Sequence, residues 1–101
     1  MNIFDLPEIP FSMTEELTTI LAENNNIRIE RIISTGQISG WYDQDETEFV
    51  VLLNGSAIIE YEDNKTIELS KGDTLLIYPH ERHRVIYTSI NPPCVWLCVF
   101  Y

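Results

Sequence analysis

Glu48 and His83 are the two side chains of this sequence best suited to acid–base or metal chemistry. Carboxylates and imidazoles carry protons in catalysis and are common ligands of divalent metals. Strand alternation places Glu48 on one face with Val50 and Leu52, and it places His83 on one face with Val85. If both faces line one barrel, the two groups meet in a small volume. Two other interpretations stay open: a solvent-facing glutamate in an acidic sequence, and a core histidine whose hydrogen bonds are satisfied.

Three further polar residues are expected beside this pair. Tyr42 and Gln44 are two positions apart and therefore share a strand face, and Tyr87 lies on the face of His83. The amide of Gln44 could bind an organic ligand or, weakly, a metal. The two tyrosines also fit the role of packing residues whose hydroxyl groups have partners.

Arg31 is expected to point into the same volume. It falls on a strand face that also carries three isoleucines, Ile27, Ile29 and Ile33. A buried guanidinium must be paired, so either Glu48 or the carboxylate of a ligand is the expected partner. The predicted pocket is lined by Arg31, Tyr42, Gln44, Glu48, His83 and Tyr87.

The spacing of several of these residues resembles the two sequence motifs of the cupin family. The first motif runs His-x-His, three or four residues, Glu, six residues, Gly, and Glu48 and Gly55 match it. The second runs Gly, five residues, Pro-x-Gly-x-x-His, and Gly72 and His83 match it. The short distance between the motifs is typical of small bacterial cupins. The resemblance covers residues 27–101 and implies a jelly-roll barrel with a pocket inside.

The first motif is degenerate here, because Tyr42 and Gln44 occupy its two histidine positions. In the second motif, His80 stands at the second glycine position. Its other interpretation is a loop residue at the barrel rim with no functional role. Metal-binding cupins hold a divalent ion with three histidines and one glutamate. The resemblance therefore implies a site for Fe, Mn, Ni or Zn, built from Glu48, His83, His80 and Gln44.

The predicted fold is all-β, a cupin-type jelly-roll barrel with one short N-terminal α-helix. Ser12 and Glu15 match a capping box. A helix over residues 13–23 is predicted by apolar residues at helical spacing, Met13, Leu17, Ile20 and Leu21. From residue 27 onward, short segments between turn residues predict strands, with Asn54-Gly55 as the clearest hairpin signal. We expect one domain, with an arm and helix in residues 1–26 and the barrel in residues 27–101.

Two of the predicted strands, residues 49–53 and 94–101, are apolar on both faces. One face can line the barrel, but the other must be covered as well. The N-terminal helix covers part of it, and a second subunit is the natural cover for the rest. The sequence therefore predicts a homodimer packed sheet to sheet.

The 16 acidic and 6 basic residues give a formal net charge of −10. Such a surface repels phosphate groups, so we expect no nucleic-acid or membrane partner. Apolar runs stay far below about 18 residues, and the N-terminus lacks the pattern of a signal peptide. Cys94 and Cys98 would lie roughly 13 Å apart on one strand, too far for a disulfide, and are predicted to be buried thiols. These features fit the cytoplasm.

Two functions are compatible with these features. A metal-dependent enzyme, such as an oxygenase or isomerase, would hold a divalent ion with Glu48 and His83. A metal-free cupin would instead bind a small organic molecule between Arg31, His83 and the tyrosines, as a sensor or storage module. A purely structural role for the dimer is a third reading, and whether the protein is an enzyme stays open.

Overall fold

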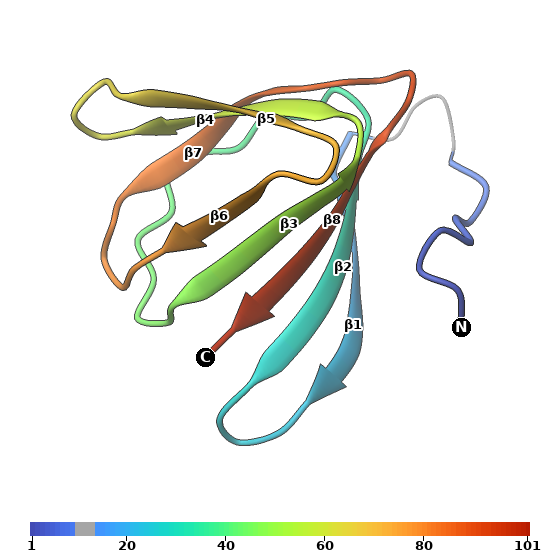
Figure 1. The fold of residues 1–101 in the computed structure, drawn as a ribbon, viewed down its shortest axis with the longest axis horizontal. Coiled ribbons are helices and arrows are strands. Elements are labelled where there is room, and N and C mark those ends of the chain that lie inside the picture. The colour runs from blue at the N-terminus through green and yellow to red at the C-terminus, as the bar shows by residue number, and fades with distance from the viewer. Residues whose placement is uncertain (10–13) are drawn as a thin grey trace.

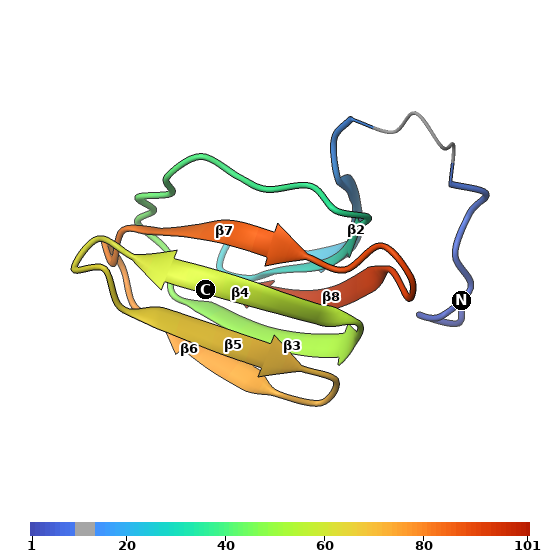
Figure 2. The same ribbon diagram turned by 90° about the horizontal axis from the view of Figure 1, so that it is seen from above.

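The computed structural model of the protein describes residues 1–9 and 14–101. Its strands are β1 (Leu17–Glu23), β2 (Arg28–Ser34), β3 (Glu48–Asn54), β4 (Ser56–Tyr61), β5 (Thr66–Ser70), β6 (Thr74–Ile77), β7 (His83–Thr88) and β8 (Cys94–Phe100). They form two antiparallel sheets, a five-stranded sheet in the order β1-β2-β8-β3-β6 and a three-stranded sheet in the order β5-β4-β7. The smaller sheet lies over one end of the larger one, as Figures 1 and 2 show. This two-sheet arrangement fits the expected jelly roll.

The core lies between the sheets because the central strands turn alternate apolar residues inward. In β3 the inward residues include Val50 and Leu52, and in β8 they include Trp96 and Cys98. The register places Val50 opposite Cys98 and Leu52 opposite Trp96. Ile59 of β4 packs into the same cluster from the other sheet. This alternation decides which side chain of each strand reaches the barrel interior.

The prediction of an N-terminal α-helix is wrong. Residues 17–23 form β1, which pairs antiparallel with β2 at the edge of the larger sheet. Thr18, Thr19 and Ile20 are β-branched and favour a strand, and the pairing satisfies backbone groups that a helix would leave unpaired on β2. Ser12 and Met13 lie outside the described residues, and the described ranges contain no helix. Accordingly, no helix that could cross a lipid bilayer is found in them.

Three asparagines, Asn24, Asn25 and Asn26, follow β1 and lie in the turn that leads to β2. The backbone N–H of Asn24 donates to the carbonyl of Ile27 at 2.9 Å. The side-chain oxygen of Asn24 accepts hydrogen bonds from the backbone N–H groups of Asn26 and Ile27, at 2.8 and 3.0 Å. Asparagine suits this role because its side chain can close a turn on its own backbone.

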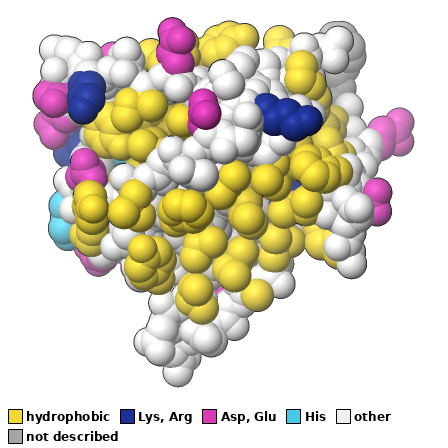
Figure 3. Space-filling view, viewed as in Figure 1, with side chains coloured by type: hydrophobic (Ala, Val, Ile, Leu, Met, Phe, Trp, Pro, Cys, Tyr) yellow, Lys and Arg dark blue, Asp and Glu magenta, His cyan; other side chains and the backbone are white. Residues whose placement is uncertain are grey.

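The outer side of the larger sheet is apolar where β6, β3 and β8 meet. The paired residues there, termed the outer apolar face, are Phe49, Val51, Leu76, Leu97 and Val99. Phe49 and Leu76 are 38% and 37% exposed. In Figure 3, hydrophobic side chains spread over the middle of the view, with charged side chains mainly at the border. The face therefore carries no charge in a protein whose net charge is −10.

We propose that a second copy of the chain covers the outer apolar face. The same uncharged patch on two copies can pack around a two-fold axis, while the acidic surfaces stay apart. Light scattering on a size-exclusion column should give a dimer at micromolar concentration for the parent and a monomer for Phe49→Glu. Ile38→Glu, which adds the same charge at a loop side chain that is 69% exposed, should leave the dimer intact. A monomeric parent would contradict the proposal.

Candidate functional site

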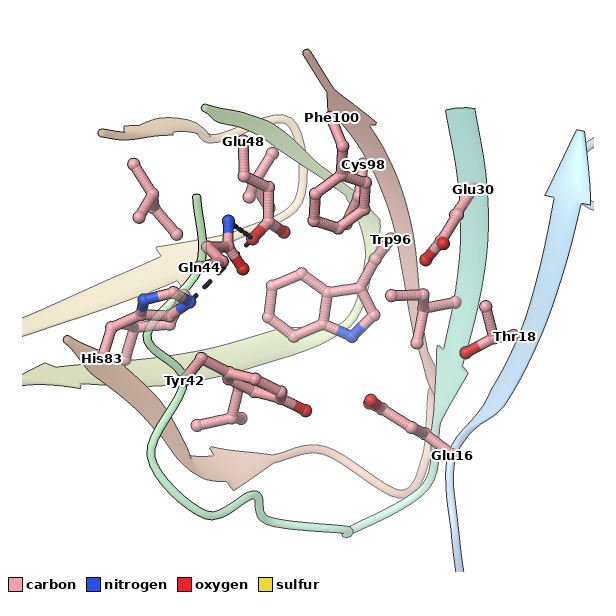
Figure 4. A pocket seen from close by; sticks show the side chains of 15 residues that line it. Glu16, Thr18, Glu30, Tyr42, Gln44, Glu48, His83, Trp96, Cys98 and Phe100 are labelled. Carbon is pink, nitrogen blue, oxygen red and sulfur yellow. Dashed lines mark hydrogen bonds and ion pairs between the residues drawn. The ribbon is translucent and has the colours of Figure 1, made fainter. Parts of the chain in front are cut away.

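A cavity of about 250 Å³ lies inside the barrel and is lined by residues of both sheets. Figure 4 shows the aromatic rings of Tyr42, Trp96 and Phe100 around it. The polar part of its lining consists of Glu16, Thr18, Glu30, Tyr42, Gln44, Glu48 and His83. The structure thus brings together four of the six side chains that the sequence suggested, and it adds two glutamates and a threonine.

Glu48 begins β3 and is 8% exposed. Its Oε1 accepts a hydrogen bond from the side-chain amide of Gln44 at 3.2 Å. Burial raises the pKa of the Glu48 carboxyl, and hydrogen bonds from Gln44 and Cys98 oppose that shift. The pKa of the Cys98 thiol is raised well above its ordinary value, mainly by burial, so the thiol stays protonated and donates to the carboxylate.

His83 begins β7 on the opposite sheet and is 4% exposed. Its Nδ1 lies 2.8 Å from the carbonyl oxygen of Glu81. A carbonyl only accepts, so Nδ1 carries the proton and, in the neutral imidazole, Nε2 is an acceptor. Nε2 lies 3.9 Å from Oε1 of Glu48, beyond hydrogen-bond distance. The tautomer is therefore fixed from outside the cavity, and Nε2 is left available to a ligand.

Tyr42 is held beside His83 by the backbone. An isolated bridge joins the two residues, with N–H···O distances of 2.7 and 3.2 Å, and their rings lie 5.5 Å apart between centroids. Burial raises the pKa of Tyr42, so its phenol stays protonated. The segment between β2 and β3 thereby carries both Tyr42 and Gln44 across the opening of the barrel (Figure 4).

Arg31 is not brought to the pocket. It lies on the other side of β2, is 4% exposed, and donates through Nη1 to the carbonyls of Ile3 and Asp5 at 3.3 and 3.0 Å. The prediction chose the wrong face of this strand: Glu30 and Ile32 line the cavity, so Arg31 and Ile33 lie on the other side of β2. Carbonyl groups, rather than Glu48, are the partners of Arg31.

Glu30 and Glu16 line the cavity, and sequence reasoning missed both. Glu30 is on the inward face of β2, where the register places it opposite Cys98, and it accepts a hydrogen bond from Nε of Arg28 at 2.6 Å. Glu16 precedes β1 and accepts one from the hydroxyl of Ser34 at 3.2 Å. Burial raises the pKa of Glu16. Apolar residues occur on both faces of β2 and of its neighbour β8, so alternation in the sequence did not identify Glu30.

Tyr87 is also outside the cavity lining, and it is 46% exposed. The pairing of β4 with β7 shifts between Ile58 and Ile59, whose partners are Tyr87 and Val85. This bulge adds one residue to β7 and interrupts the alternation that begins at His83. The side chain of Tyr87 therefore does not follow His83 and Val85 into the barrel.

His80 lies on an exposed loop, with a side chain that is 64% exposed. Its Nδ1 is 2.7 Å from Asp43 and its Nε2 is 3.3 Å from Asp45. The hydrogen bond with Asp43 raises the pKa of His80. Both ring nitrogens are thus engaged at the surface, as expected for the loop residue rather than for a ligand inside the barrel.

The residues suggested as metal ligands do not form a complete metal site. Glu48 and His83 could reach one ion, but His80 is engaged elsewhere and Gln44 is bonded to Glu48. Within residues 1–9 and 14–101, no group of three or more His, Cys, Asp and Glu side chains is arranged to hold a metal. Tight divalent sites in proteins usually have three or four such ligands. The donor set therefore does not fit a tightly bound divalent ion.

Comparisons with known proteins agree with the fold. Residues 30–100 match the family described as a cupin domain. A crystal structure from Ralstonia eutropha JMP134, described as a "putative mannose-6-phosphate isomerase", is 39% identical, with 99% of this chain and 94% of that chain covered and a TM-score of 0.88. A cupin superfamily protein from Desulfitobacterium hafniense DCB-2 shares the fold at 18% identity, with coverage of 91% and 82% and a TM-score of 0.77. No curated protein matches the sequence.

The family match covers both motif segments, and the structure places Glu48 of the first and His83 of the second in one cavity inside the barrel. The chain therefore belongs to the cupin family.

Proposed function

We propose that this cupin binds a small polar organic molecule inside its barrel without a tightly bound metal. The observation that supports it is the buried pair of Glu48 and His83, whose facing atoms are 3.9 Å apart and too distant to satisfy one another. Buried polar groups normally have hydrogen-bond partners. Glu48 has one in Gln44, whereas Nε2 of His83 has none among the described residues, which favours a ligand that bonds to Nε2 beside Glu48. At about 250 Å³ the cavity is near the lower end for small-molecule sites, so the ligand is small.

The surrounding residues fit a binding role. His83 is oriented by Glu81, Glu48 is oriented by Gln44, and neither needs to move to meet a ligand. The rings of Tyr42 and Trp96 offer apolar contact area to its carbon skeleton. Because Trp96 already donates its indole N–H to Ser34 at 3.0 Å, its ring contributes packing rather than a hydrogen bond.

Metal content tests this proposal against the metal-dependent alternative. Protein purified without a chelator or a metal-affinity tag should contain far less than one Fe, Mn, Ni or Zn ion per chain by plasma mass spectrometry. Glu48→Gln and His83→Ala should not change that content. Near-stoichiometric metal in the parent that both variants lose would overturn the proposal.

A thermal-shift screen of small organic molecules supplies the positive evidence. A ligand at about 100 times its Kd stabilises a protein by about 2.7 kcal/mol. That corresponds to a rise in Tm of more than about 10 °C for a domain of this size. The shift should be lost in His83→Ala, and a screen in which parent and variant respond alike would count against the pocket.

An isomerase is the second candidate, favoured by the 39% identity to the Ralstonia protein. Isomerisation of an aldose needs one group to remove a proton beside the carbonyl and another to return it. Glu48, with its raised pKa, and His83 could share that work. None of the lining residues in the described chain is Lys or Arg, so the lining has no cation for a phosphate. Turnover of mannose 6-phosphate to fructose 6-phosphate would establish this function in place of the first.

We also propose that the protein resides in the cytoplasm. Cys94 and Cys98 are both free and buried, as expected of thiols in a reducing compartment.

A further inference from the structure

The polar atoms that face the cavity are mostly hydrogen-bond acceptors. They are the carboxylates of Glu16, Glu30 and Glu48 and, in the neutral imidazole, Nε2 of His83. The Gln44 amide already bonds to Glu48 and the Trp96 indole N–H to Ser34. The hydroxyl groups of Thr18 and Tyr42 also line the cavity, and a hydroxyl can accept as well as donate. A ligand rich in donors would satisfy this surface, whereas a carboxylate or phosphate would add acceptors to it.

The three glutamates differ in how their charge is compensated. Glu30 has an ion pair with Arg28 at 2.6 Å. Among the described residues, the hydrogen-bond partner of Glu16 is the neutral hydroxyl of Ser34, and the partners of Glu48 are an amide and a thiol. No Lys or Arg is among the described residues that line the cavity. Two carboxylates that line one cavity and have no cationic partner among the described residues attract a cation and repel an anion.

His83 supplies an independent observation. Its side chain is 5% exposed and lines the cavity, yet Nε2 has no partner within hydrogen-bond distance among the described residues. Oε1 of Glu48 lies 3.9 Å from it. A charged nitrogen forms hydrogen bonds of about 2.8 Å, so one nitrogen placed between these two atoms can bond to both. Figure 4 shows this pair at one end of the cavity, with Glu16 on the opposite side.

We propose that the ligand carries a protonated amine, an inference that rests on the proposed binding function. Its ammonium group donates to Oε1 of Glu48 and to Nε2 of His83. The rest of the molecule lies between the rings of Tyr42 and Trp96 and extends toward Glu16. Aromatic faces beside a cation add to its binding.

Two series of matched small molecules test the charge preference by isothermal titration calorimetry. One series is mannosamine, mannose and mannose 6-phosphate, and the other is benzylamine, benzyl alcohol and benzoate. In at least one series the amine should bind at least 10-fold more tightly than the neutral compound, and the anion should show no binding. Equal affinities within both series, tightest binding of an anion, or no amine binding up to 10 mM would each overturn the inference.

Variants connect that preference to the pocket. Glu48→Gln keeps the shape of the side chain and should weaken amine binding at least 10-fold while changing the neutral compound less than 2-fold. Glu16→Gln should weaken the amine several-fold, which keeps the test valid if Glu48→Gln does not fold. The control Glu68→Gln removes an equal charge from an exposed position on β5 and should change the affinity for each compound less than 2-fold. Unchanged amine affinity in both pocket variants would refute the assignment.

The two proposals fail in different ways. Binding of a neutral or anionic compound that is lost in His83→Ala would overturn the amine inference and leave the binding function standing. Stoichiometric metal held by Glu48 and His83 would overturn the binding function itself, because the ion would then occupy the position proposed for the ligand.

Discussion

Gly55→Ala is expected to lower the Tm of the protein by more than about 10 °C, although it adds only one methyl group. Gly55 joins β3 to β4 with φ at +88°, a region that costs a residue with a side chain about 1–2 kcal/mol. A Cβ there would lie 2.8 Å from Oγ of Ser89 and 2.9 Å from Cα of Cys94. Overpacking of this kind costs about 1–3 kcal/mol. A total of about 3 kcal/mol, within the sum of these ranges, corresponds to about 12–24 °C at about 4–8 °C for each kcal/mol.

The surroundings of Gly55 cannot move aside cheaply. The hydroxyl of Ser89 accepts from the backbone N–H of Ser56 at 3.0 Å and donates to the carbonyl of Pro92 at 2.7 Å. The thiol of Cys94 donates to the carbonyl of Ser56 at 3.1 Å. Shifting Ser89 or Cys94 would therefore break hydrogen bonds that connect the β3–β4 turn to the start of β8.

Gly72→Ala is the matched control, because Gly72 has φ at +90° but no heavy atom within 4 Å of an added Cβ. It should lose only the backbone contribution, about 1–2 kcal/mol. Thermal unfolding followed by circular dichroism measures both variants. If Gly55→Ala proves no less stable than Gly72→Ala, the close approach to Ser89 and Cys94 has no energetic weight.

Strands after residue 27 could be predicted from the sequence because the signals that specify them are local. Alternating apolar residues and the pair Asn54-Gly55 specify strands and a hairpin without reference to the rest of the chain. The N-terminal error has the opposite origin. Leu17, Ile20 and Leu21 are compatible with a helix when viewed alone, and pairing with the exposed edge of β2 decides the outcome.

The candidate site divides in the same way. Glu48 and His83 were found from their strand faces and from motif spacing, and the structure places them in one cavity. Arg31 was expected to point into the barrel, but Glu30 lines the cavity and Arg31 lies on the other side of β2. Apolar residues occur on both faces of that strand, so alternation alone does not select the inner face. The bulge beside Ile58 that displaces Tyr87 has no sequence signal of its own.

The replaced residues of the first motif give the pocket its chemistry. With Tyr42 and Gln44 at the two histidine positions, the cavity loses two imidazole ligands and gains a phenol and an amide. The amide is used to hold Glu48, and the backbone at Tyr42 is paired with His83. The remaining glutamate and histidine are thus positioned by neighbours that bind metals weakly, which favours hydrogen bonding to an organic molecule.

Glu48→Gln is expected to stabilise the ligand-free protein at pH 7 even though it weakens binding. Burial raises the pKa of the Glu48 carboxyl above the ordinary value of 4.5, so the folded state holds the proton more tightly than the unfolded state. The stability that follows from this is complete below about pH 4.5 and is lost as the pH rises through the folded-state pKa. Glutamine has no charge to bury at any pH, so the variant avoids this loss.

The difference in Tm between Glu48→Gln and the parent should therefore be near zero at pH 4 and grow to several degrees by pH 7. A gain of about 1 kcal/mol, common for stabilising substitutions, would give about 4–8 °C. Glu16 also has a raised pKa through burial, so part of the pH dependence should persist in the single variant and shrink further in the double variant with Glu16→Gln. The Tm of Glu68→Gln should follow that of the parent across the pH range. A Glu48→Gln variant less stable than the parent at pH 7 would mean that the carboxylate is held for the fold, whereas the expected gain would mark it as a charge kept for a ligand.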